Sequence, residues 1–123
     1  MTKEALNALT DEGLVEKFAQ YAHEWGEACA AGNTSRAGKM VFRLRDLSNE
    51  LKSRGPAARM KLAPLMVSMD PGTRYYAAHH LLALLPEQSR AAITSVWDAG
   101  LYGISGTAGM TLGNLEDGTF TPT

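Results

Sequence analysis

The sequence has a single cysteine and no long apolar run, and both absences narrow the kinds of protein it can encode. Cys29 has no second cysteine with which to form a disulfide or a Cys-x-x-Cys motif, and no cation lies beside it in the sequence. We therefore expect a buried, unreactive thiol in a reducing compartment. The first residues hold no apolar signal core, and no segment approaches the length that a bilayer crossing needs. These features predict a cytoplasmic protein without a membrane partner.

Motifs that carry enzyme chemistry are also missing. No serine stands in a Gly-x-Ser-x-Gly elbow, and the glycines of residues 100–109 follow no predicted strand, as a phosphate-binding loop requires. The acidic residues are scattered, so no carboxylate pair for acid–base catalysis stands out. We therefore predict no catalytic residue, no metal and no cofactor, and the sequence leaves open whether the protein has any activity.

The net charge of −1 conceals an uneven distribution along the chain. Residues 1–35 carry two basic and six acidic side chains, residues 36–61 carry eight and two, and residues 62–123 carry two and five. A basic middle segment can mark an acidic partner or nucleic acid, although charged helix faces are more often solvated surface.

Three prolines, Pro56, Pro71 and Pro86, stand fifteen residues apart, and each precedes a stretch with apolar residues at helical spacing. Proline suits the first position of a helix but breaks a helix interior. We therefore predict that each of these prolines begins a helix. Pro64 lies inside the first stretch, so that helix should kink or split near residues 60–62.

Apolar periodicity predicts six helices and no strand. The first two cover about residues 10–31 and 34–54, three begin at the prolines, and a weak sixth covers about 108–116. Residues 119–123 should form a frayed tail. The predicted core positions recur every three or four residues and include Leu14, Phe18, Trp25, Met40, Val41, Leu44, Leu47, Leu51, Leu62, Ala77, Leu81, Ile93, Val96, Trp97, Met110 and Leu112.

The repeated spacing of proline and arginine predicts one helical-repeat domain over residues 1–123, with a core at about 10–118. Arginine follows proline by three residues at Arg59 and Arg74, and by four at Arg90. Such recurrence is typical of α-α superhelices of the HEAT or armadillo kind, in which stacked helix pairs bury a shared face. The predicted fold class is all-α, with about three antiparallel helix pairs.

Two family resemblances agree with this fold. Residues 70–81 resemble the start of the second helix in a HEAT-type repeat, which implies structural roles: Asp70 and Pro71 begin the helix, and Arg74 bonds the turn or a neighbouring repeat. Over about residues 10–118 the chain resembles a family of small bacterial helical proteins known as a domain of unknown function, which implies the superhelix and assigns no activity. That likeness is carried by Arg54-Gly55 with Arg59, by Leu62-Ala63-Pro64-Leu65 and by Ala108-Gly109-Met110-Thr111-Leu112.

The most conspicuous polar cluster joins Tyr75 and Tyr76 to His79 and His80. Each tyrosine stands four residues before a histidine, so we expect two adjoining pairs on the helix side away from the small core residues, facing solvent or a groove. Adjacent histidines diverge by about a hundred degrees, whereas helical zinc sites place histidines four apart. Surface packing or ligand contact is therefore favoured over a metal site.

The superhelix places a basic ridge beside this cluster. The second helix of each pair lines the concave side of such a stack, which puts Arg36, Lys39 and Arg43 next to the tyrosines and histidines. A basic and aromatic face suits an acidic protein partner, and equally a nucleic acid with unstacked bases. We predict a protein-interaction module, regulatory or toxin-neutralising in kind. The alternative is a nucleic-acid-binding protein or a nucleic-acid enzyme with a HEAT-like cradle.

Apolar residues outside the predicted core indicate self-association. Phe42 lies off the core stripe of its helix, and the region around Tyr102 and Phe120 has few charges. Exposed apolar surface of this kind commonly marks a contact. We therefore expect a homodimer formed through Phe42 or through the last two helices.

Overall fold

A computed structural model describes residues 2–123, and all regular structure within them is helical. In chain order the elements are α1 (Lys3–Asn7), α2 (Asp11–Ala30), α3 (Thr34–Ser53), α4 (Pro56–Arg59), the 3-10 helix η1 (Met60–Val67), α5 (Pro71–Leu81), α6 (Pro86–Asp98) and α7 (Ile104–Glu116). Across these residues no helix combines the length and the apolar character needed to cross a membrane. The all-α prediction is confirmed, and α1 is a short additional helix that the periodicity did not indicate.

Helix starts follow the local signals in the sequence. Pro56, Pro71 and Pro86 are each the first residue of a helix, as predicted. The Thr10 hydroxyl accepts a hydrogen bond from the amide of Gly13 at 3.0 Å and so satisfies one of the free N–H groups that begin α2. The split predicted near residues 60–62 is also present, because α4 ends at Arg59 and the 3-10 turns of η1, which contain Pro64, begin at Met60.

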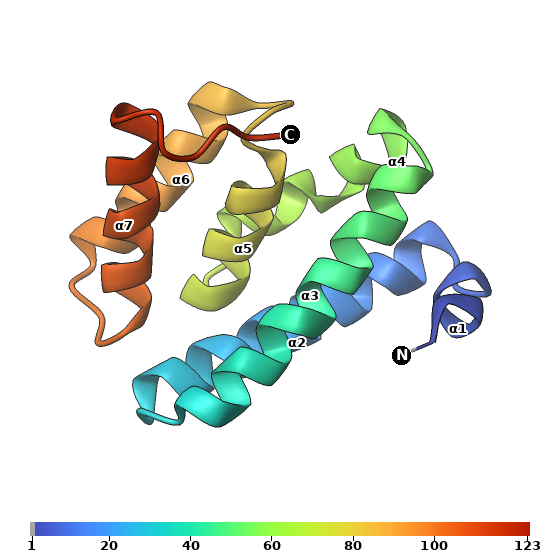
Figure 1. The fold of residues 1–123 in the computed structure, drawn as a ribbon, viewed down its shortest axis with the longest axis horizontal. Coiled ribbons are helices and arrows are strands. Elements are labelled where there is room, and N and C mark those ends of the chain that lie inside the picture. The colour runs from blue at the N-terminus through green and yellow to red at the C-terminus, as the bar shows by residue number, and fades with distance from the viewer. Residues whose placement is uncertain (1) are drawn as a thin grey trace.

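The helices pack around α5, which lies at the centre of the molecule (Figure 1). α2 and α3 form a long antiparallel pair along one side, and α6 and α7 pack on the other side of α5. α5 contacts α2, η1, α6 and α7, so it has little solvent-facing side. A helix in this position buries residues around most of its circumference, which decides the surroundings of the tyrosine–histidine cluster.

Three predicted core residues lie on the surface instead. Trp97 is 50% exposed, Met110 is 69% exposed and Val41 is 39% exposed, so these predictions are wrong. α6 buries a narrower stripe that ends at Val96, and α7 begins at Ile104 instead of about residue 108. α7 buries Ile104, Ser105, Ala108 and Thr111, and Met110 lies outside this buried stripe.

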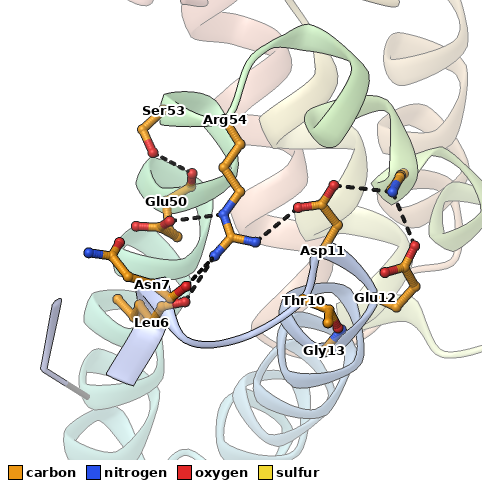
Figure 2. Close-up of polar contacts among 10 residues, drawn as sticks. Leu6, Asn7, Thr10, Asp11, Glu12, Gly13, Glu50, Ser53 and Arg54 are labelled. Atoms are coloured by element: carbon orange, nitrogen blue, oxygen red, sulfur yellow. Dashed lines mark hydrogen bonds and ion pairs between the residues drawn. The ribbon is translucent and has the colours of Figure 1, made fainter. Parts of the chain in front are cut away.

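Arg54 joins three segments at one end of the molecule (Figure 2). Its guanidinium donates to Glu50 Oε2 and to Asp11 Oδ1, each at 2.9 Å, and to the main-chain oxygen of Leu6 at 3.0 Å. The bond from Arg54 also holds the pKa of the Asp11 carboxyl below its usual value, with a second contribution from Lys61 of η1. The arginine named in the family resemblance thus fastens α1 and the start of α2 to α3.

We predict that Arg54→Gln releases α1, because a glutamine cannot reach Asp11, Glu50 and Leu6 together. The amides of Leu6 and Ala8, which bond to main-chain oxygens within the α1 segment, should then exchange with deuterium faster. Arg45→Gln is the matched control, since Arg45 lies exposed over the Phe42 ring on the same helix. Unchanged exchange at α1 in Arg54→Gln would contradict the prediction.

Candidate binding pocket at His79 and His80

The two tyrosines of the predicted cluster lie in the core, whereas His79 and His80 are partly buried and line a pocket. Tyr75 is 3% exposed and Tyr76 is 9% exposed, so the expectation that they face solvent or a groove is wrong. The Tyr75 hydroxyl shares a hydrogen bond of 2.7 Å with Thr111 Oγ1 of α7, and Trp25 of α2 packs against both tyrosine rings. Burial raises the pKa of Tyr75 to about 12. The tyrosines therefore join α2, α5 and α7 and leave no free aromatic face.

Two residues of the predicted basic ridge, Arg36 and Arg43, contact α2. Arg36 lies 3.4 Å from Glu24 Oε1, and Arg43 lies over the ring of Tyr21, with its guanidinium carbon 5.4 Å from the ring centroid. Lys39 is exposed. The structure thus does not assemble the basic and aromatic concave face from these residues. The basic residues that share a pocket with the histidines are Lys52 of α3 and Arg59 of α4, and neither is among the binding residues predicted from the sequence.

A pocket opens beside the two histidines, and we call it the His79–His80 pocket. Its volume is about 190 Å³. The lining comes from α3, α4, the end of α5 and the C-terminal tail, and consists of Ser48, Asn49, Lys52, Arg59, His79, His80, Ala83, Phe120, Pro122 and Thr123. No carboxylate side chain is among these residues, so the two cations give the pocket a positive charge.

His80 is hydrogen-bonded through both its ring and its main chain. Its Nδ1 lies 2.7 Å from Ser48 Oγ, and its main-chain oxygen accepts from Arg59 Nη2 at 2.9 Å. Burial lowers the pKa of His80 to about 3, with smaller contributions from His79 and Arg59, so its ring is neutral near pH 7. Without a carboxylate to orient the imidazole, the Ser48–His80 pair lacks the third member of a nucleophilic triad. The arrangement is suited to binding.

His79 has spare hydrogen-bonding capacity. Its Nδ1 is buried and has no hydrogen-bond partner, although buried polar atoms in proteins are nearly always bonded. Burial lowers the pKa of this histidine as well. A neutral imidazole carries one donor and one acceptor nitrogen, so the His79 ring adds an uncharged polar group to the pocket wall.

The C-terminal tail packs over the pocket, which corrects the prediction of a frayed end. Phe120 stacks on His79 with ring centroids 5.2 Å apart and planes 6° from parallel. Thr123 receives hydrogen bonds from Lys52 Nζ to its hydroxyl at 2.8 Å and from Arg59 Nη1 to its main-chain oxygen at 3.2 Å. Figure 1 shows this segment crossing from α7 toward α3 and α4. Phe120 is therefore engaged with its own chain, and the surface it was expected to offer a second copy is partly covered.

The residues assigned structural roles lie at the start of α5. Asp70 accepts a hydrogen bond from the amide of Thr73 at 2.9 Å and so caps the helix, and Arg74 Nη1 donates to the main-chain oxygen of Ser68 in the preceding turn at 3.0 Å. Pro71 occupies the first helical position. Asp70 also bonds His23 of α2 at 2.9 Å, so His23 serves this turn and takes no part in the His79–His80 pocket. Among residues 2–123 no group of His, Cys, Asp or Glu is arranged to hold a metal ion.

A second feature is an exposed apolar surface on the α6–α7 hairpin, which we call the α6–α7 surface. It consists of Trp97, Leu101, Tyr102 and Met110, exposed by 50%, 38%, 76% and 69%. A Cβ placed on Gly109 would lie 2.5 Å from the Trp97 ring, so the ring rests directly on α7. Between residues 91 and 115 the only charged side chain is that of Asp98.

Comparison with solved structures gives a match over nearly the whole chain. The crystal structure of the protein RPA1889 from Rhodopseudomonas palustris CGA009 is similar, with a TM-score of 0.86 and 30% sequence identity, over 96% of this chain and 98% of that one. No curated protein matches the sequence. Residues 12–116 match the protein family described as a domain of unknown function, DUF2019. The all-helical chain, with its proline-initiated helices and its Arg54-Gly55 turn, therefore belongs to the DUF2019 family.

Proposed function

We propose that this chain is a protein-interaction module that docks its partner on the α6–α7 surface. The observation that carries the proposal is the exposure of Trp97, Tyr102 and Met110 within a stretch that holds a single charged side chain. The buried centres of protein interfaces are enriched in aromatic residues and methionine and depleted in charge. We therefore propose this apolar surface as the contact surface, in place of the basic and aromatic concave face expected from the sequence.

A HEAT-like superhelix is our proposal for the architecture behind this surface. Consecutive helices pack on one another in the order α2 with α3, η1 with α5, and α6 with α7, which supports a stack of three pairs. In such a stack the terminal pair has an outer face that no further repeat covers. The α6–α7 surface is then the open end of the stack, a position that favours contact with a partner.

Ion pairing within the basic segment favours a protein partner over nucleic acid. Arg36 pairs with Glu24, Arg54 with Asp11 and Glu50, and Lys61 with Asp11 and Glu12. These pairs reduce the positive charge that a phosphate backbone could use, since binding to nucleic acid depends on the number of free cations that meet phosphates.

We also propose a cytoplasmic location. Cys29 is the only cysteine of the chain, and burial raises the pKa of its thiol. A protein that needs no disulfide is suited to a reducing compartment. Fractionation of cells that express a tagged copy would test this location.

The partner we propose is a second copy of the chain, because an apolar surface can meet itself across a two-fold axis. The carboxylates of Glu27 and Asp70, which line a hollow with Leu101 and Tyr102, lie beside this surface. We predict that the wild-type chain sediments as a dimer and that Met110→Glu and Tyr102→Glu weaken the dimer by about tenfold or more, since each would bury a charge without a partner. Gln20→Glu, an exposed change of the same charge on α2, should leave the dimer unchanged.

Sedimentation velocity over a range of protein concentrations measures this prediction. A monomer at high micromolar concentration would contradict self-association. A dimer that resists both substitutions would contradict the α6–α7 surface and would direct attention to Phe42, which is 58% exposed but covered on one side by Arg45.

A further inference from the structure

We propose that the His79–His80 pocket is a binding site for an oxyanion, a phosphate or carboxylate group held between Lys52 and Arg59. The pocket lies on the α3–α5 side of the molecule and uses none of the residues of the α6–α7 surface. The two proposals are therefore independent, and each is tested by residues that the other does not contain.

The charge of the pocket selects an anion. Lys52 and Arg59 form no ion pair with any carboxylate side chain of residues 2–123, whereas Arg54 and Lys61, close by in the sequence, each contact two. The two histidines add no charge near pH 7 because burial lowers the pKa of both. Two cations with no carboxylate side chain beside them favour a ligand that carries negative charge.

The C-terminal tail shows that both cations donate hydrogen bonds to oxygen atoms in this pocket. Lys52 donates to the Thr123 hydroxyl, and Arg59 donates to the Thr123 main-chain oxygen. Both acceptors are oxygen atoms of Thr123, the last residue of the sequence, and its main-chain oxygen is a carboxylate oxygen wherever that end is free, so Arg59 already bonds an oxygen of the kind that an oxyanion offers. Hydrogen bonds between charged partners are roughly twice as strong as those between neutral ones, so a phosphate or carboxylate group should compete with Thr123 for the two cations.

The pocket also has room and further donors for such a group. Its volume of about 190 Å³ equals roughly the share of six water molecules in the liquid, which accommodates a small anion. The unpartnered His79 Nδ1 is a polar atom that a ligand oxygen or its bridging water would satisfy. Arg59 is held in place by its bond to the His80 main-chain oxygen, so part of the site is already organised before a ligand enters.

Titration with inorganic phosphate, and separately with acetate, tests the proposal by NMR at constant ionic strength. We expect saturable shifts at the amides of His79, His80, Phe120, Thr121 and Thr123. Lys52→Gln, an exposed position, should weaken binding by about tenfold or more through the loss of one charged hydrogen bond. Lys39→Gln is the matched control, because Lys39 is exposed on the same helix and does not line the pocket.

A third variant separates ligand binding from a purely structural role of Lys52. Thr123→Ala removes the hydroxyl that now occupies Lys52 and should bind the anion more tightly than the wild-type chain. If phosphate binds more tightly than acetate, the pocket is a phosphate site. If acetate binds more tightly than phosphate, it is a carboxylate site. The proposal is overturned if neither ion saturates, or if Lys52→Gln and Lys39→Gln bind alike.

Discussion

Replacing Gly72 by alanine should lower the free energy of unfolding by about 1–3 kcal/mol, the usual cost of overpacking a well-filled core. A Cβ at Gly72 would lie 2.5 Å from the main-chain oxygen of Ala22 and 3.2 Å from the Cα of Gly26. Both atoms belong to the backbone of α2 and cannot move aside by a change of rotamer. α2 and α5 would therefore have to separate along the contact that brings Trp25 against Tyr75.

Gly38→Ala is the control for this substitution. Gly38 lies inside α3, and a Cβ there would meet no atom within 4 Å. Alanine at such a helical position should raise the free energy of unfolding by about 0.5–1 kcal/mol, because it lowers the entropy of the unfolded chain. Urea denaturation of both variants measures the difference, and equal effects at the two positions would show that α2 and α5 do not approach as closely as the structure indicates.

Local signals in the sequence predicted the helices well. The prolines that begin α4, α5 and α6, the cap at Asp70, and the interruption near residues 60–62 each depend on a few neighbouring residues. Backbone preferences of this kind act within one helical turn, so they predict where a helix begins without knowledge of the tertiary structure. The close contact of Gly26 with Gly72 is different, since it joins residues far apart in the chain and neither shows an unusual local pattern.

The candidate site was only partly predictable. The sequence predicts a binding role for His79 and His80, and both line the pocket. It also predicts a solvent-facing side for α5, whereas this helix is enclosed by α2, η1, α6 and α7. A helix with aromatic and small residues around its circumference gives a weak periodic signal, which is itself a sign of a central position. Lys52 and the Phe120 tail reach the pocket only through tertiary packing, so no spacing in the sequence indicates them.

Acid should destabilise this protein through its buried histidines. His80 is surrounded by Ser48, His79, Arg59 and Lys52 in the pocket and by the rings of Tyr76 and Phe18. None of these side chains carries a carboxylate that could stabilise an imidazolium, and burial lowers the pKa of His80 from 6.5 to about 3. Below pH 6.5 the unfolded chain therefore binds a proton that the folded chain does not accept.

The sign and size of the effect follow from this difference in bound protons. Above pH 6.5 the ring is neutral in both states and the free energy of unfolding does not depend on it. As the pH falls from there, His80 should lower the free energy of unfolding by about 1.4 kcal/mol per pH unit, or about 2 kcal/mol by about pH 5. The pKa of His79 is lowered in the same direction, which steepens the decline.

Urea denaturation at a series of pH values measures this slope, and His80→Asn should reduce it, because asparagine does not titrate but can still bond to Ser48. His23 provides a control of opposite sign. Its hydrogen bond with Asp70 raises the pKa of the imidazole, so its stabilising contribution is present at pH values below 6.5 and is lost as the pH rises through the raised pKa. His23→Gln should therefore remove stability at acidic pH and leave the His80 slope in place. An acid slope that is the same in wild-type and His80→Asn chains would show that the imidazole accepts its proton while folded, and that the pocket is more open to water than its packing implies.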